Sequence, residues 1–181
     1  MTEIKGFRIA VLATDGVEEV ELTKPIEALK KAGADITLVS LKSGQIQAME
    51  EDVNPAGRYD VDLTVAEADA QSFDGLVLPG GTTNPDKLRM DEKAVAFVKA
   101  FVSNDKPIAA ICHGAWTLID AGGVAGHTMT SWPSLQTDLR NAGATWVDET
   151  VVKDRKLVTS RNPKDLPAFC EAIVELFAKA A

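Results

Sequence analysis

Short runs rich in apolar residues recur along the chain and alternate with stretches of helical spacing. Runs that lack alternating polar residues are typical of strands buried on both faces of a parallel sheet. They predict strands at residues 7–13, 35–41, 75–78, 108–111, 129–130, 146–152 and 157–160.

Apolar residues three or four positions apart predict helices between these strands. Leu22, Ile26 and Leu29 mark one face of the first helix, and Gly33 ends it. Pro25 is expected in or near its first turn, because a proline deeper in a helix removes a needed N–H group.

Further helices are predicted around residues 95–102, 116–121 and 166–180. Ser134 is a plausible N-cap for one more helix, since serine is favoured at that position. The segment 42–70 carries a weaker pattern that is compatible with short strands or with a hairpin.

Alternation of buried strands and helices predicts an α/β fold with a parallel sheet covered on both faces. The 181 residues fit a single domain spanning residues 1–181. Ligands in such folds bind at the carboxyl ends of the strands. This rule directs attention to residues 15–19, 79–81 and 112–114.

Composition narrows the function classes. A net charge of -8 argues against nucleic-acid binding, which needs a basic surface. The apolar N-terminal run is too short for a membrane span and lacks a signal-peptide cleavage site. The chain has two cysteines, Cys112 and Cys170, far apart in sequence, so a reduced, cytoplasmic protein is expected.

Cys112 is the leading candidate for reactive chemistry. It follows a buried strand directly, with Gly114 and a predicted helix after it, as in a nucleophile elbow. A helix N-terminus would lower the pKa of its thiol. The alternative is an ordinary buried cysteine, because the glycine usually found two residues before the nucleophile is missing. Cys170 lies among core-facing positions of the last helix and is expected to be inert.

Other residues near strand ends could support such a nucleophile. Gly80 and Gly81 could turn backbone N–H groups toward an oxyanion, or form a plain turn. The carboxylates of residues 18–21 could complement the helix dipole, or one could point into the crevice as an acid or base. His113 could hold a proton but needs an orienting partner. The two histidines lack metal-ligand spacing, so no metal or cofactor is expected.

Five blocks of sequence together resemble the PfpI-type intracellular proteases of the ThiJ/PfpI superfamily. That superfamily also includes the parkinsonism-associated protein, glyoxalase-like enzymes and bacterial general-stress proteins. The blocks are AVLATDGVEEVEL, LVLPGG, AAICHGAWTLIDAG, TSWPSLQTDLRNAGA and LVTSRNPKDLPAFC.

The resemblance implies a flavodoxin-like three-layer sandwich with a mostly parallel central sheet, the fold also of class I glutamine amidotransferases. It implies a homodimer or larger assembly, and it maps the nucleophile onto Cys112 and the adjacent histidine onto His113. The glutamate that hydrogen-bonds the cysteine maps onto Glu18. The oxyanion donors map onto the backbone of Gly81 and His113.

In the protease-like branch a carboxylate of the neighbouring subunit orients the histidine, and here it maps onto Asp86. Asp86 is one methylene shorter than the usual glutamate, and Ala115 stands where proline is common. Asp86 could instead cap a short helix through residues 88–90.

The function expected from this resemblance is a stress-related cysteine hydrolase. Its substrates would be adducts of glyoxal or methylglyoxal, or peptides. The alternative is a non-catalytic redox sensor or chaperone that uses an oxidisable Cys112. A glutamine amidotransferase is disfavoured, because those enzymes carry a late histidine and this chain has none after His127.

Overall fold

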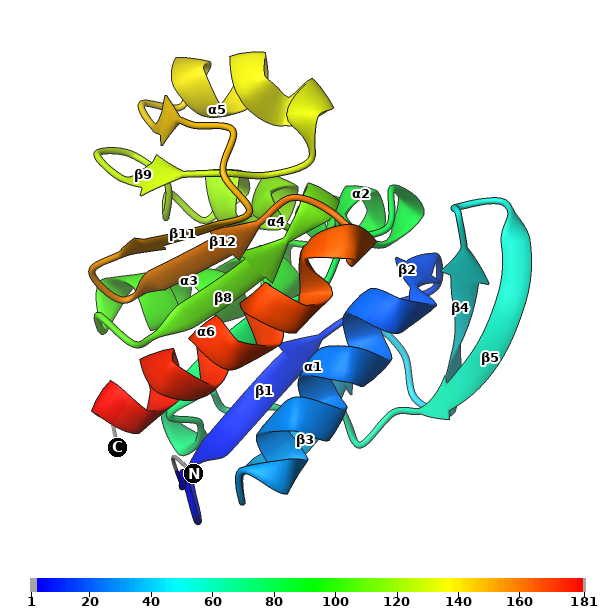
Figure 1. Ribbon diagram of the computed structural model, residues 1–181. Helices are drawn as coiled ribbons and strands as arrows, with labels where there is room; N and C mark the ends of the chain where they lie inside the picture. Colours follow the sequence, from blue (N-terminus) through cyan, green and yellow to red (C-terminus); the bar gives the residue numbers. More distant parts are fainter. Residues whose placement is uncertain (1–2, 181) are drawn as a thin grey trace.

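A seven-stranded sheet forms the centre of the molecule, in the computed structural model that describes residues 3–180 (Figure 1). The strand order is β11-β12-β8-β7-β1-β3-β6, and every pair is parallel except β11 with β12. The strands are β1 (Arg8–Leu12), β3 (Asp35–Ser40), β6 (Leu63–Thr64), β7 (Gly75–Leu78), β8 (Ile108–Ile111), β11 (Val151–Asp154) and β12 (Leu157–Ser160).

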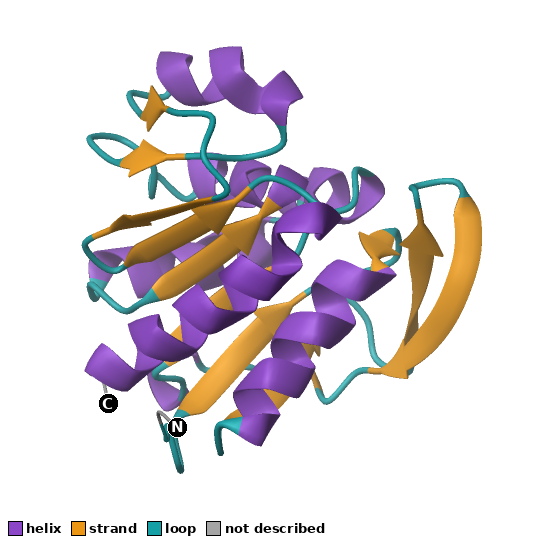
Figure 2. Cartoon of the chain, in the orientation of Figure 1, coloured by secondary structure: helices purple, strands orange, loops and turns teal. Residues whose placement is uncertain are grey.

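Helices cover both faces of this sheet (Figure 2). Helices α1 (Glu19–Lys31) and α6 (Leu166–Ala180) pack on one face; α2 (Thr83–Met90), α3 (Glu92–Ser103) and α4 (Ala115–Asp120) lie on the other. Side chains of β1 alternate between the layers: Ile9 joins the core under α1 and α6, and Ala10 joins the opposite core. The predicted three-layer α/β sandwich with a mostly parallel sheet is confirmed.

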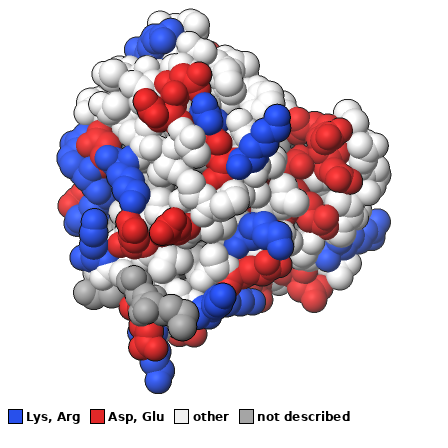
Figure 3. Space-filling view, viewed as in Figure 1, with Lys and Arg blue, Asp and Glu red and all other residues white. Residues whose placement is uncertain are grey.

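A separate hairpin stands beside helix α1 (Figure 1). It consists of β4 (Gln45–Glu50) and β5 (Asn54–Asp60), and β4 also pairs with β2 (Val17–Glu18). The segment 42–70, whose pattern was compatible with short strands or a hairpin, therefore contains a hairpin. Figure 3 shows acidic side chains gathered at the edge of the molecule where this hairpin lies, and Glu50 at the end of β4 and Glu51 and Asp52 in the turn are exposed.

A small group of elements, formed by β9 (Thr128–Met129), α5 (Gln136–Asn141) and β10 (Thr145–Trp146), lies outside the main sheet. Its elements differ from those that the sequence predicted. The strand predicted at 146–152 is two elements: β10 pairs with β9, and β11 belongs to the main sheet. Ser134 is not an N-cap, because it lies inside a 3₁₀ turn and α5 follows without a side-chain cap.

Pro25 also lies deeper than expected. Helix α1 begins at Glu19, so Pro25 falls in its second turn. Proline there removes the N–H group that would otherwise bond the carbonyl of Glu21. Gly33 follows the end of α1 in a left-handed conformation, as expected.

One further property concerns membranes. None of the helices within residues 3–180 is both long enough and apolar enough to cross a bilayer.

Candidate active site

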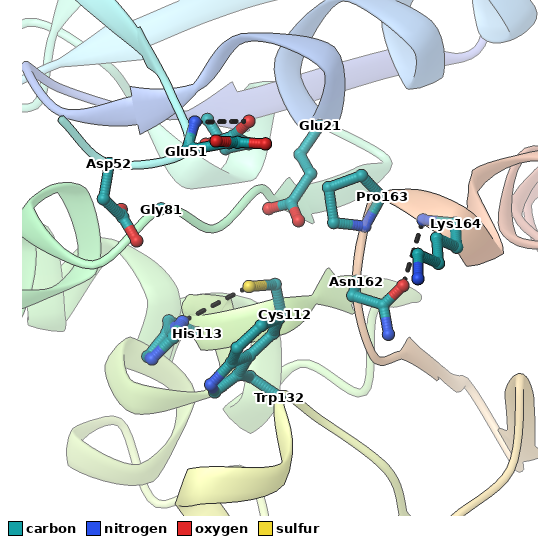
Figure 4. A pocket seen from close by; sticks show the side chains of 11 residues that line it. Glu21, Glu51, Asp52, Gly81, Cys112, His113, Trp132, Asn162, Pro163 and Lys164 are labelled. Carbon is teal, nitrogen blue, oxygen red and sulfur yellow. Dashed lines mark hydrogen bonds between the residues drawn. The ribbon is translucent and has the colours of Figure 1, made fainter. Parts of the chain in front are cut away.

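A cavity of about 510 Å³ opens at the carboxyl ends of β7 and β8, beside the start of α1 (Figure 4). The three predicted strand-end loops all contribute to it, as expected for a parallel sheet. Its lining residues are Glu18, Glu21, Glu51, Asp52, Gly81, Cys112, His113, Trp132, Asn162, Pro163 and Lys164.

Cys112 stands on a strained turn between β8 and α4. Its φ of 60° lies in the left-handed region, which a non-glycine residue adopts at an energetic cost. Gly114 makes the turn possible, because a Cβ atom there would lie 2.3 Å from the carbonyl oxygen of Leu78. This is the geometry of a nucleophile elbow.

Gly80 supplies the close approach that this elbow needs on its other side. A Cβ atom on Gly80 would lie 2.7 Å from Cβ of Cys112 and 2.5 Å from Oε2 of Glu21. The turn therefore forms without a glycine two residues before the cysteine, because the neighbouring loop provides the room.

Glu21, and not Glu18, lies at the cysteine. The Glu21 carboxyl group accepts a 2.9 Å hydrogen bond from the N–H of Gly80, and Cys112 is among the groups that shift its pKa. Glu18 lines the same cavity, but its Oε1 accepts from the N–H of Glu51 at 3.2 Å. The position of Glu21 differs from that of Glu18 because the chain is still extended at Glu18, whereas helix α1 turns Glu21 toward Cys112.

Burial is the largest influence on the pKa values of Glu21 and Cys112. Desolvation raises the pKa of Glu21 to about 8, so its carboxyl group is mostly protonated at neutral pH. Burial and the charge of an ionised Glu21 also raise the pKa of the Cys112 thiol. The N–H groups of His113 and Gly81 donate to the sulfur and lower that pKa. Burial thus opposes the lowered thiol pKa that the elbow alone led us to expect.

His113 is held against the same sulfur. Its Nδ1 lies 3.2 Å from Sγ of Cys112. The ring stacks on Trp132 with centroids 5.6 Å apart and meets the edge of Trp116 at 5.0 Å. Burial lowers the pKa of His113, so the imidazole is neutral at neutral pH and can accept a proton.

Asp86 is exposed on α2 and is not among the residues that line the cavity. It lies in the first turn of that helix and does not cap it, since the residue before the helix is Thr82. Its role across a subunit interface stays a prediction.

Six residues that line the cavity were given no role from the sequence: Glu51, Asp52, Trp132, Asn162, Pro163 and Lys164. Asp52 reaches it from the β4–β5 turn, Trp132 from the loop before α5, and Lys164 from the turn before α6. Trp132 and Lys164 lie in two of the sequence blocks that resemble the PfpI-type proteases, but their place at the cavity depends on how distant loops pack. Within residues 3–180, no three His, Cys, Asp or Glu side chains are grouped so that they could hold a metal ion.

Known proteins share both the sequence and this fold. The DJ-1/PfpI family model matches residues 7–176. A Bacillus subtilis protein, YraA, provisionally named as a cysteine protease, is 41% identical over 90% of this chain and 93% of its own. A deglycase of Thermococcus kodakarensis is 39% identical over 94% and 99%, and general stress protein 18 of Bacillus subtilis is 39% identical over 96% and 99%.

Among solved structures, Drosophila melanogaster DJ-1beta superposes with a TM-score of 0.85. It is 30% identical, and the match covers 96% of this chain and 91% of that one. The chain therefore belongs to the DJ-1/PfpI family.

Proposed function

We propose that the protein is a stress-related cysteine hydrolase with Cys112 as its nucleophile. The observation that carries the proposal is the convergence on one sulfur of the Glu21 carboxyl group, the His113 imidazole and two backbone N–H groups. Relatives of the family named as a cysteine protease, a deglycase and a general stress protein support a hydrolase-type activity.

The geometry suits acyl transfer. The thiol proton passes to Nδ1 of His113, and the sulfur attacks a substrate carbonyl carbon to form a C–S bond. The N–H groups of Gly81 and His113 then stabilise the charge on the carbonyl oxygen. The bond to the leaving amine breaks as His113 returns the proton to it. Water finally hydrolyses the thioester and restores the thiol.

Glu21 serves this cycle as a hydrogen-bond donor. Its pKa of about 8 keeps it protonated near neutral pH, and a protonated carboxyl group favours negative charge on the sulfur. A charged carboxylate in the same place would repel that charge.

Two substrate classes fit the cavity. Its volume of about 510 Å³ accommodates a small adduct of glyoxal or methylglyoxal, or the side chain and carbonyl of a peptide residue. The names of the relatives favour both classes.

A comparison of the two cysteines tests the proposal. Turnover is measured on peptides, on unfolded protein, and on peptides treated with glyoxal or methylglyoxal. Cys112→Ser should lower kcat by roughly a thousandfold or more, because the hydroxyl is a far weaker nucleophile. Cys170→Ser is the matched control and should keep wild-type turnover. Wild-type protein that turns over none of these substrates would contradict the proposal.

A redox sensor is the second candidate. It is favoured by the opening of the Cys112 sulfur into the cavity, which a small oxidant can enter. Reversible oxidation of Cys112 at low peroxide, without turnover, would support this function in place of hydrolysis.

A further inference from the structure

The turn between β4 and β5 brings an acidic side chain from far along the chain to the candidate active site. Glu51 and Asp52 occupy this turn with φ values of 54° and 65°. Two consecutive non-glycine residues in the left-handed region are costly, and such strain persists only where surrounding contacts fix it. The contacts of Asp52 are of that kind.

Both carboxylate oxygens of Asp52 are fixed by one residue. Oδ1 accepts from the N–H of Thr82 at 2.7 Å, and Oδ2 accepts from its Oγ1 at 2.8 Å. Two donors on an ionised carboxylate hold it in one orientation. Thr82 directly follows Gly81, one of the two N–H donors to the Cys112 sulfur. These hydrogen bonds therefore attach the β4–β5 turn to the loop that carries Gly81.

The fixed carboxylate lies in the same cavity as His113. Figure 4 shows Asp52 beside Gly81, on the side of the cavity where His113 lies. The negative charge of Asp52 raises the pKa of His113 against the effect of burial.

We propose that Asp52 is a positioning residue that supplies, within the same chain, the negative charge that stabilises His113 in its protonated form. This inference rests on the proposed function, in which His113 carries the proton between thiol and leaving group. A buried imidazole accepts a proton reluctantly, and a fixed carboxylate across the cavity offsets that cost. Asp86 of a second subunit is then not needed for this role.

Other charged groups line the cavity that holds His113 or lie near its neighbour Trp116. They are Glu18, Glu21 and Glu51 on the α1 and hairpin side, Lys164 on the α6 side, and Arg89, whose guanidinium lies 5.5 Å from the ring of Trp116. The test therefore changes Asp52 alone and compares it with changes at Asp86 and Thr82.

The experiment is an NMR titration of the histidine rings in the intact protein. The chain has two histidines, and His127, which lies 3.2 Å from Asp154, serves as the internal reference. Asp52→Asn should lower the titration midpoint of His113 by about 0.5 pH unit or more, because a nearby charge is removed. The midpoint of His127 should not move.

Three further variants separate charge from structure. Asp52→Gly tolerates the left-handed turn and should lower the His113 midpoint as Asp52→Asn does. Thr82→Val removes one hydrogen bond to Asp52 but keeps the charge, so the midpoint should stay near the wild-type value. Asp86→Asn should also leave it in place.

The opposite pattern would overturn the inference. A His113 midpoint unchanged in both Asp52 variants would do so, as would one lowered by Asp86→Asn. In turnover assays, Asp52→Asn should lower kcat more than it changes KM and should shift the acidic limb of the pH profile to lower pH. The NMR titration needs no substrate, so a lack of wild-type turnover would contradict the hydrolase proposal without affecting this result.

Discussion

Glu21 shows how one carboxyl group can differ from its neighbours in the same helical turn. Glu19 accepts hydrogen bonds from Tyr59 and Gly57 at the protein surface, and these lower its pKa. Glu21 is fully buried, and its Oε1 has no hydrogen-bond partner among the described residues. An ionised carboxylate in that position is expensive, whereas a carboxylic acid is tolerated. Burial therefore favours the protonated form of Glu21, which can donate a hydrogen bond.

This assignment predicts how stability depends on pH. The pKa of Glu21 is raised from 4.5 to about 8, so between these values the folded protein binds more protons than the unfolded chain. The free energy of unfolding should fall as pH rises through this window, by up to about 1.4 kcal/mol per pH unit from this group. Glu21→Gln should remove that slope.

Urea unfolding at several pH values from 5 to about 8 measures the effect. Glu27→Gln is the matched control, since Glu27 lies on the exposed face of the same helix. It should retain the wild-type slope. Equal slopes in wild-type and Glu21→Gln protein would show that Glu21 is ionised throughout.

At the scale of elements, the site depends on the close approach of two strand-end loops. The loop after β7 contributes Gly80 and Gly81, and the turn after β8 contributes Cys112. A Cβ atom on Gly80 would lie 2.7 Å from Cβ of Cys112, and one on Gly114 would lie 2.3 Å from the carbonyl oxygen of Leu78. Each loop therefore needs the absence of a side chain on the other to bring N–H groups within reach of the sulfur.

Gly114→Ala tests this packing. The backbone of Gly114 is helical, so alanine suits its conformation, but the new Cβ atom would clash with the carbonyl oxygen of Leu78. We expect a loss of about 2–3 kcal/mol in the free energy of unfolding, together with loss of turnover. Gly122→Ala is the control: it carries the strain of φ 73° but meets no atom within 4 Å. It should cost about 1 kcal/mol and preserve turnover. A smaller effect for Gly114→Ala than for the control would mean that the two loops can move apart.

The sequence predicted elements well where local pattern decides them. Apolar runs gave β7 and β8 because a strand buried on both faces leaves no room for polar residues. The same pattern could not separate Glu18 from Glu21, because which one faces the cysteine depends on where α1 begins. The place of Asp52 could not be predicted for another reason. It depends on a hairpin that packs on a loop distant in sequence.

Across the whole molecule, the site and the packed rings of Phe7 and Phe177 lie at opposite ends of the sheet. The cavity is at the carboxyl ends of the strands. Phe177, near the end of α6, packs at the other end: a Cβ atom on Gly75, the first residue of β7, would lie 2.5 Å from its ring, and the ring of Phe7 is 5.9 Å away. Stability and catalysis should therefore be separable by substitution.

Phe177→Ala makes that separation measurable. Phe177 is fully buried, so its truncation removes apolar contacts and leaves a cavity, which costs about 3–5 kcal/mol in a protein core. Urea unfolding should show this loss. Turnover per folded molecule, counted by titration of the Cys112 thiol, should remain at the wild-type value, because the strand ends that carry the site keep their hydrogen-bonded register. A kcat that falls while the folded fraction stays near one would show instead that packing of α6 against the sheet controls the geometry at Cys112.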